Sequence, residues 1–247
     1  MQIGAQFFTV RNQCQTLDDF ALTLRKVADI GYKTVQISGT CPYDAQWLKA
    51  QLAANDLQCV LTHIPVPRLV GETQQVIADH HVFGCENIGL GWYAFNETDT
   101  YEKFMETYPR VAEEIRAGGR YFMYHNHDQE FKRLGDQIIL EKLAQEIPAD
   151  VMGFTLDTFW IQAGGGDPAQ WVKNLAGRVP VIHLKDYAYG RKMAVVGEGN
   201  INFDRVFSAA EESGTKYMLV EQDDCNGEDP IECLRRSYEY LKACGFN

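Results

Sequence analysis

Three kinds of feature are missing from this sequence, and each absence excludes a class of protein. No apolar run approaches the roughly 20 residues that a membrane-spanning helix needs. The first residues carry no basic segment followed by an apolar core, so we expect no secretory signal peptide. Seven cysteines are scattered without a CxxC pair, which argues against a disulfide framework and a thiolate zinc site. We therefore expect a cytoplasmic protein that does not bind membranes.

Basic residues are also few. The 247 residues include 23 Lys and Arg against 34 Asp and Glu, which gives a formal net charge of −11. An acidic surface repels the phosphate backbone of nucleic acids, so we expect no nucleic-acid partner. Hydrophobic residues make up 45% of the chain and charged residues 23%, which are globular proportions that argue against intrinsic disorder.

Short apolar segments alternate with amphipathic segments along almost the whole chain. The apolar segments are rich in Val, Ile, Phe and Tyr, and they predict strands over residues 3–9, 34–38, 59–63, 87–90, 121–125, 153–157, 180–185 and 217–221. The amphipathic segments predict helices over residues 17–29, 44–55, 72–83, 98–117, 136–146, 168–176, 204–213 and 229–244.

The strict alternation of eight strands and eight helices predicts a parallel sheet built from βα units. Eight such units in about 250 residues are the size of a closed (β/α)8 TIM barrel. A doubly wound open sheet is the alternative, but it would carry a glycine-rich loop after the first strand, where this sequence reads Thr9-Val-Arg-Asn-Gln13. No linker-like change in composition divides the chain. We therefore predict that residues 1–247 form one α/β barrel domain.

Ionisable residues follow several predicted strands at the point where each strand ends. In a TIM barrel these carboxyl ends form the rim that carries function. The third strand ends at His63, and the last four strands bring Glu130, Asp157, His183 and Glu221 to the same rim. Three carboxylates and one imidazole suit a divalent ion such as Mn²⁺, Mg²⁺, Co²⁺ or Zn²⁺. Any one of them would be unremarkable as a solvated loop residue, but four together favour a metal site.

The alternation of side chains along a strand suggests further residues of the site. His183 and Lys185 share one face of their strand, and so do His125 and His127, so each pair is expected to point into the barrel mouth. Lys185 beside a metal would hold a cation near the substrate oxygens. For both histidines the alternative is a hydrogen-bonded position on the rim.

Other polar and aromatic residues have weaker assignments. Glu198 lies in a tight turn after the seventh strand and is expected at the same rim, while Trp92 is expected to stack on the apolar face of a sugar ring. A plain turn and aromatic packing are the alternatives. His80 and His81 are adjacent on a predicted helix and cannot share a face, so we expect both at the surface.

At these positions the chain resembles the xylose isomerase-like TIM-barrel superfamily, specifically the bacterial sugar phosphate isomerase/epimerase proteins. The resemblance covers essentially the whole chain and is specific for the fold and the metal site. It rests on Gly4-Ala-Gln-Phe-Phe-Thr-Val-Arg11, Tyr124-His-Asn-His-Asp-Gln-Glu-Phe131, Leu156-Asp157 with the glycine loop after it, His183-Leu-Lys-Asp186, Gly197-Glu-Gly199 and Val220-Glu-Gln222.

The resemblance also implies roles for particular residues. The implied metal ligands are Glu130, Asp157, His183 and Glu221. The implied substrate contacts are His63, His127, Lys185 and Glu198. Relatives that place a glutamate directly at the end of strand five have His125 or His127 at that place here, so a histidine is the alternative to Glu130 as ligand.

The implied reaction is the abstraction of a proton beside a metal-chelated carbonyl of a sugar or sugar phosphate, with Glu221 as base and Glu130 or His127 as its partner. Return of the proton makes an isomerase or epimerase. Loss of a β-leaving group makes an inosose-dehydratase-like lyase or a lyase that cleaves 3-keto-glycosides. Trp160 stands where relatives have a histidine three residues after Asp157, which argues against strict ketose-epimerase chemistry.

Two alternatives belong to other functional classes. The first is an apurinic-endonuclease-like phosphodiesterase of the same superfamily. Such an enzyme would need more histidines than this chain has, and a basic surface, whereas this chain is acidic. A non-catalytic sugar-binding subunit would keep the pocket without turnover. In either enzyme branch the partner is a small carbohydrate, and the resemblance also allows a homo-oligomer.

Overall fold

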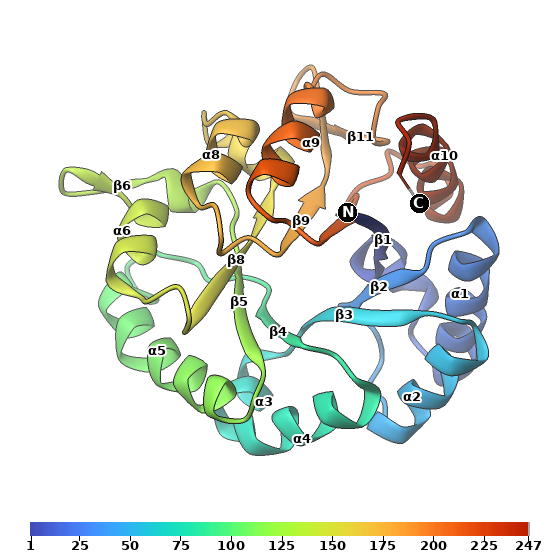
Figure 1. Cartoon of the computed structure of the whole chain (residues 1–247), viewed down its shortest axis with the longest axis horizontal. Coiled ribbons are helices and arrows are strands. Elements are labelled where there is room, and N and C mark those ends of the chain that lie inside the picture. Colours follow the sequence, from blue (N-terminus) through green and yellow to red (C-terminus); the bar gives the residue numbers. More distant parts are fainter. Residues whose placement is uncertain (247) are drawn as a thin grey trace.

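The computed structural model describes residues 1–246, and in it eight parallel strands close into a barrel surrounded by helices (Figure 1). The predicted TIM barrel is therefore confirmed. Its strands are β1 (Gln2–Gln6), β2 (Thr34–Ile37), β3 (Gln58–His63), β4 (Asn87–Leu90), β5 (Tyr121–His125), β8 (Met152–Asp157), β9 (Val181–Leu184) and β12 (Tyr217–Val220). β1 closes the barrel by pairing with β12, where Gln2 lies opposite Tyr217.

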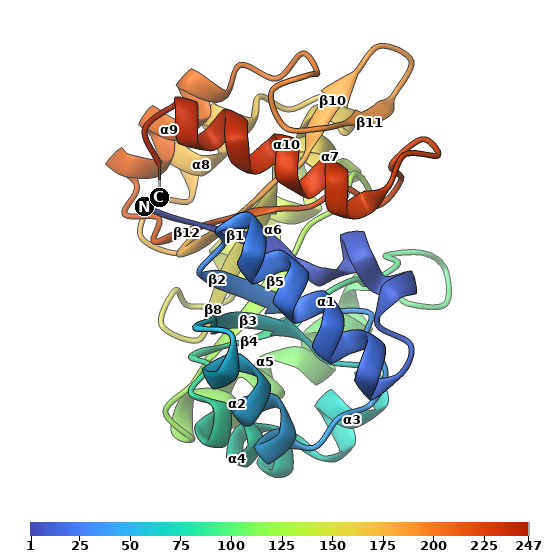
Figure 2. The ribbon, with the colours of Figure 1, turned by 90° about the vertical axis from the view of Figure 1, so that its right-hand side faces the viewer.

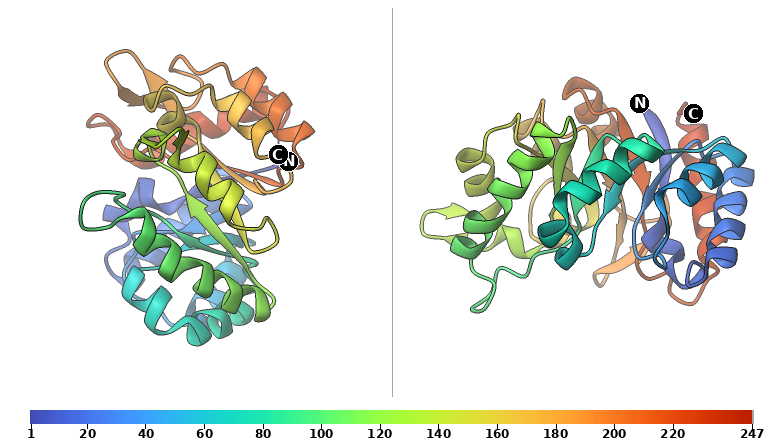
Figure 3. Two further views of the ribbon diagram at one scale, coloured as in Figure 1. Left: turned by 90° about the vertical axis from the view of Figure 1, so that its left-hand side faces the viewer. Right: turned by 90° about the horizontal axis from the view of Figure 1, so that it is seen from below.

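Helices cover the outside of the barrel on all sides (Figure 3). They are α1 (Leu17–Ile30), α2 (Ala45–Ala54), α3 (Val66–Gly71), α4 (Thr73–Phe83), α5 (Tyr101–Ala117), α6 (Ile139–Glu146), α7 (Thr158–Ala163), α8 (Pro168–Asn174), α9 (Phe203–Glu212) and α10 (Pro230–Ala243). Several begin at a side-chain cap that satisfies a free backbone N–H: Thr16 accepts from the N–H of Asp19, and Asp167 accepts from that of Gln170.

Close packing inside the barrel fixes the strands against each other. Val60, Leu61, Met123, Val181 and Leu219 form one buried apolar cluster contributed by four strands. Gly4 in β1 allows its neighbours to approach, because a Cβ atom at this position would lie 2.3 Å from Oγ1 of Thr34. Since strands in such a barrel are all parallel, their carboxyl ends lie at one end of the cylinder.

The first predicted strand is longer than the one observed. β1 ends at Gln6, and residues Phe7–Gln13 turn into the 3-10 helix η1. The turn begins because the side-chain oxygen of Gln6 accepts a hydrogen bond from the backbone N–H of Phe8. Local side-chain capping therefore ends the extended run that the apolar residues predicted.

Two short hairpins and two short helices were not predicted. β6 (Arg133–Leu134) pairs with β7 (Gln137–Ile138), so the sixth helix begins at Ile139 and not at residue 136. β10 (Asp186–Ala188) pairs with β11 (Lys192–Ala194) beyond the end of β9. The helices α3 and α7 follow β3 and β8 directly. Figure 2 shows α7 and the β10–β11 hairpin at the end of the barrel opposite to the N-terminus.

The expected surface position of His80 is wrong. His80 is only 1% exposed, and its Nδ1 donates to the carbonyl oxygen of Val76 at 2.6 Å while its Nε2 accepts from the hydroxyl of Thr62 at 2.8 Å. The face of α4 that carries His80 packs on the barrel, whereas His81 points outward and is exposed. Burial lowers the pKa of His80 to about 4. No helix within residues 1–246 combines the length and apolar character needed to cross a bilayer.

Candidate active site

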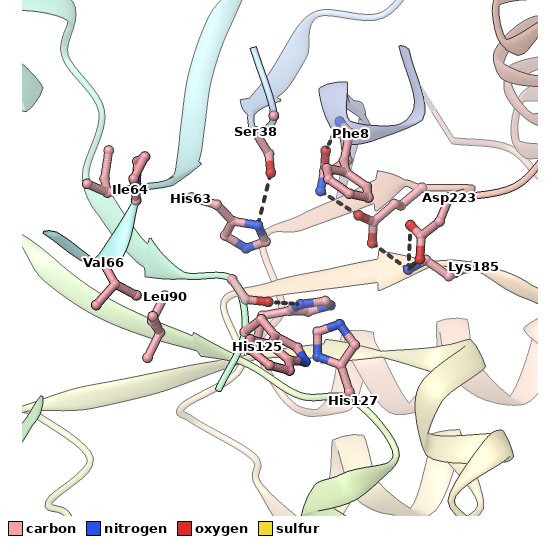
Figure 4. A pocket seen from close by; sticks show the side chains of 16 residues that line it. Phe8, Ser38, His63, Ile64, Val66, Leu90, His125, His127, Lys185 and Asp223 are labelled. Carbon is pink, nitrogen blue, oxygen red and sulfur yellow. Dashed lines mark hydrogen bonds and ion pairs between the residues drawn. The ribbon is translucent and has the colours of Figure 1, made fainter. Parts of the chain in front are cut away.

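A pocket of about 430 Å³ opens at the carboxyl ends of the barrel strands (Figure 4). Its lining comes from the ends of β1, β2, β3, β4, β5, β9 and β12 and from the loops that follow them. Histidine, lysine and carboxylate side chains lie on its floor, and apolar side chains lie along one wall. The pocket therefore occupies the place where TIM-barrel proteins carry their sites.

Four buried side chains converge beside the pocket floor: His125, Asp157, His183 and Glu221. Each offers one ligand atom, and the four atoms all lie within 4.8 Å of one another. None of the four residues is more than 3% exposed. The barrel register explains part of this arrangement, because Asp157 of β8 pairs directly with His183 of β9. Below, this group is called the donor cluster.

The outer nitrogen of each histidine in the donor cluster is held by a partner outside it. Nδ1 of His125 donates to the carbonyl oxygen of Gly91 at 3.0 Å, and Nε2 of His183 donates to Oε1 of Gln36 at 2.6 Å. These bonds direct Nε2 of His125 and Nδ1 of His183 toward the cluster, where Nε2 of His125 lies 3.3 Å from Oδ2 of Asp157. The same division of roles is common for histidines that bind metals.

The two carboxylates of the donor cluster are anchored in the same way. Oδ1 of Asp157 accepts from the backbone N–H of Trp160 at 3.0 Å, because Asp157 also caps α7. Oε1 of Glu221 accepts from the side-chain amide of Gln6 at 2.5 Å. In each residue one oxygen is fixed by the fold, and Oδ2 of Asp157 and Oε2 of Glu221 face the cluster.

These inward-facing atoms fit a cation. Nδ1 of His183 and Oε2 of Glu221 lie 2.9 Å apart, yet the two atoms are buried without a hydrogen bond of suitable geometry. Both carry lone pairs in this arrangement, so a positive charge between them satisfies both. Two imidazoles and two carboxylates make a donor set that suits borderline divalent ions such as Mn²⁺, Co²⁺ and Zn²⁺.

Lys185 supplies a positive charge at the edge of the donor cluster. Its Nζ lies 3.0 Å from Oδ2 of Asp157, 2.9 Å from Oε2 of Glu221 and 3.0 Å from Oδ1 of Asp223. Burial alone would lower the pKa of Lys185, but these three carboxylates raise it above its ordinary value. The lysine is therefore charged, and one ammonium group is shared among three carboxylates.

The surroundings of the ionisable groups in the pocket shift their pKa values in different directions. Burial favours protonation of Glu221, but the charge of Lys185 holds the pKa of its carboxyl well below the usual range. Burial raises the pKa of Asp223 to about 6. Burial also lowers the pKa of His63 and of His127, so both imidazoles are neutral near pH 7.

Glu130 departs from its predicted place. It lies on the short 3-10 helix η2 (Gln129–Phe131), which folds back toward β5. One carboxylate oxygen accepts from the hydroxyl of Tyr124, and the other accepts from the backbone N–H of His127 at 2.7 Å. Burial raises the pKa of Glu130 to about 7. The structure does not bring Glu130 to the donor cluster, where His125 occupies the fourth position.

Glu198 is also placed away from the site. Its side chain is half exposed and lies 3.4 Å from Nε of Arg236 in α10. The buried carboxylate of Asp186 accepts from the backbone N–H groups of Gly197 and Gly199, each at 2.9 Å, and this loop holds Glu198 outside the pocket lining. The structure thus places Glu198 beside α10 and not among the residues that line the pocket.

The remaining predicted contact residues do line the pocket: His63, Trp92, His125, His127 and Lys185. Nδ1 of His63 lies 3.2 Å from the hydroxyl oxygen of Ser38, and its Nε2 has no partner. The ring of His127 lies 5.1 Å from that of Trp160, which also stands 5.5 Å from Nζ of Lys185.

The sequence interpretation missed two amides that orient the donor cluster. Gln6 and Gln36 are fully buried near the ends of β1 and β2. A signal was available, because each is a polar residue near the carboxyl end of its strand, which forms the rim. The contact of Asp223 with Lys185 cannot be read from the sequence, because it joins two residues that are 38 positions apart and follow different strands.

Known proteins match the whole of this architecture. The chain is 21% identical to the inosose dehydratase of Clostridium beijerinckii over 90% of this chain and 89% of that protein. A sugar phosphate isomerase/epimerase from Parabacteroides distasonis superposes with a TM-score of 0.85 at 22% identity, covering 98% of this chain and 93% of that one. An L-ribulose 3-epimerase superposes with a TM-score of 0.78 at 16% identity, covering 98% and 94%.

At these identities the structural likenesses establish the fold alone. The family assignment rests on a separate comparison. Residues 24–244 match the sequence model of the family described as "Xylose isomerase-like TIM barrel". This span includes every residue of the donor cluster and all but the first barrel strand. The chain therefore belongs to the xylose isomerase-like TIM barrel family, as its sequence motifs indicated.

Proposed function

We propose that this protein is a divalent-metal-dependent isomerase or epimerase that abstracts a proton beside the carbonyl group of a sugar. The observation that carries the proposal is the donor cluster, in which four ligand atoms lie within 4.8 Å of one another beside an open pocket. The holding residues would be His125, Asp157, His183 and Glu221, with His125 in the place predicted for Glu130. A bound ion would polarise a carbonyl oxygen and stabilise the negative charge that develops there.

The acid–base groups follow from the positions and charges of the pocket residues. Glu221 faces the pocket and is ionised, so it is the proposed base. His127 and His63 also face the pocket, and each is a neutral imidazole with one ring nitrogen unpartnered. Either can hand a proton to the substrate or take one from it. Lys185 would orient substrate oxygens while it holds Asp223.

A lyase reaction on the same residues is the second candidate. If the substrate carries a leaving group one carbon further along, the same proton abstraction ends in elimination. The similarity to an inosose dehydratase supports this branch. A phosphodiesterase is disfavoured, because the one lysine that lines the pocket is already paired with three carboxylates.

The direct test is solvent deuterium exchange. The protein is stripped of metal with a chelator, reloaded with Mn²⁺, Co²⁺ or Zn²⁺, and incubated in D₂O with a panel of keto-sugars and 3-keto-glycosides. Deuterium incorporation measured by NMR reports proton abstraction whichever product forms. We expect exchange only in the reloaded protein, and its absence from every metal and substrate pair would overturn the proposal.

Two variants separate catalysis from binding. Asp157→Asn keeps the cap of α7 but removes a charged donor, so it should lose metal-dependent stabilisation and exchange. Asp167→Asn is the matched control, since Asp167 caps α8 in the same way far from the pocket. Glu221→Gln should abolish exchange while ligand binding remains. A Glu221→Gln protein with normal exchange would remove Glu221 as the base.

A further inference from the structure

The pocket has two chemically different sides. Figure 4 shows Ile64, Val66 and Leu90 on the side away from Lys185 and Asp223. Pro65 and Trp92 complete this side, which we call the apolar wall: Ile64, Pro65, Val66, Leu90 and Trp92. It is built by the end of β4, the start of α3 and the loops that follow β3 and β4. The charged floor comes instead from β9 and β12, so the two sides belong to different parts of the barrel rim.

Two members of the apolar wall are unusually open to solvent. Trp92 is 55% exposed and Val66 is 42% exposed, although large apolar side chains gain free energy when they are buried. Ile64 and Leu90 behind them are buried and give the wall a fixed base. An open tryptophan above a firm apolar base can take up a flat apolar group.

The cavity is larger than a single sugar ring requires. Its volume of about 430 Å³ lies within the range of roughly 300–1,000 Å³ that holds drug-sized ligands. A second cavity of about 390 Å³ adjoins it at the loop after β2. The lining residues that the two cavities share are Ser38, Gly39, His63, Ile64 and Pro65. A sugar at the donor cluster would leave the space along the apolar wall free.

The charges of the pocket disfavour a phosphate group in that space. Among the described residues that line the first cavity, Lys185 is the one lysine or arginine, and three carboxylates share it. Arg68 lines the second cavity, but it is paired with Glu72 and Asp79. A phosphate carries close to two negative charges near pH 7. Each cationic side chain that lines the two cavities is already paired with carboxylates, so none is left to hold a phosphate along the apolar wall.

We propose that the apolar wall is a subsite for an uncharged apolar substituent of the substrate, so that the ligand is a non-phosphorylated keto-glycoside with an aromatic or similar apolar aglycone. The sugar ring lies over the donor cluster, as the proposed function requires, and the aglycone packs between Trp92 and Val66. Trp92 and Val66 are specificity-determining residues in this arrangement. They select the substituent and do not touch the reacting carbon.

The test compares ligands that differ in one group. Binding of phenyl β-glucoside, methyl β-glucoside and glucose 6-phosphate to the full chain is measured by calorimetry, with and without Mn²⁺. We expect the phenyl glucoside to bind about tenfold more tightly than the methyl glucoside, because the phenyl ring buries apolar area. Equal affinities, tighter binding of the phosphate, or no glycoside binding at millimolar concentration would each overturn the proposal.

Variants assign the preference to the apolar wall. In Trp92→Ala and in Val66→Ser the ratio of the phenyl glucoside affinity to the methyl glucoside affinity should fall from about tenfold to near one. Tyr189→Ala is the matched control, because Tyr189 is an aromatic residue 93% exposed on the β10–β11 hairpin and outside this cavity. A preference that persists in both wall variants contradicts the assignment.

The outcome is independent of the catalytic proposal. A phenyl preference with no metal-dependent deuterium exchange would keep the subsite and remove the proposed reaction. Metal-dependent deuterium exchange without a phenyl preference would keep the proposed reaction and remove the subsite.

Discussion

Nζ of Lys185 lies 2.9 Å from Oε2 of Glu221, the same oxygen that faces Nδ1 of His183. The ammonium group thus neutralises part of the donor cluster when no other cation is bound. A lysine and a divalent ion would compete for the same carboxylate oxygens. This relationship links the stability of the protein to metal binding.

Replacing Lys185 by Met should therefore destabilise the metal-free protein. The change leaves buried carboxylates without their counter-charge, which typically costs about 3–5 kcal/mol. Urea unfolding in the presence of a chelator measures the loss, and added Mn²⁺ should restore more stability to Lys185→Met than to the wild type. Lys33→Met is the matched control, because Lys33 forms an exposed ion pair with Asp56. Equal stability of the two metal-free proteins would contradict this role for Lys185.

Gln36→Leu tests the outer support of the cluster. Gln36 accepts the Nε2 proton of His183, so its loss frees the imidazole to turn or change tautomer. We expect the metal affinity to fall by about 10–100-fold, because this is the usual loss when the residue that hydrogen-bonds to the other nitrogen of a metal-binding histidine is replaced. Titration of the chelator-stripped protein with Co²⁺ or Zn²⁺ measures the change. Gln46→Leu, on the exposed face of α2, should leave the affinity unaltered.

Glu130→Gln distinguishes the two candidates for the fourth ligand. The amide keeps an oxygen for the N–H of His127 and can still bond to Tyr124, so the local fold is retained. Metal affinity should change little in Glu130→Gln and fall by more than about tenfold in His125→Ala. The reverse order of the two effects would return the fourth ligand to Glu130.

The buried imidazole of His80 should make stability depend on pH. In the folded protein the pKa of His80 is about 4, against 6.5 for an unperturbed histidine. The unfolded chain therefore takes up a proton first as the pH falls. The stability contributed by neutral His80 is complete above about pH 6.5 and is lost between pH 6.5 and 4, by roughly 3 kcal/mol in total.

His80→Gln removes this dependence. The difference in unfolding free energy between wild type and His80→Gln should be largest at pH 7 and should shrink by roughly 2 kcal/mol at pH 5. Urea unfolding at a series of pH values measures it, with His81→Gln as the control on the exposed side of the same helix. A difference that stays constant from pH 7 to 5 would show that folding does not shift the pKa of His80.

The sequence pattern determined the barrel and the rim that carries the donor cluster. Eight apolar segments separated by amphipathic ones leave few arrangements other than a parallel barrel, because each helix must cover the sheet it follows. Parallel strands end at one edge, so Asp157, His183 and Glu221 were predicted to meet. Their meeting did not depend on the path of any loop.

The path of the loops decided the rest. Glu130 stands five residues beyond the end of β5, and only η2 determines that it bonds to Tyr124 and leaves its place to His125. Hydrogen bonds from the N–H groups of Gly197 and Gly199 to Asp186 likewise hold Glu198 outside the pocket. Within a strand, the alternation of side chains determines which way each side chain points. Beyond the end of a strand, the position of a residue depends on hydrogen bonds between segments that are distant in the sequence, and these form only in the folded chain.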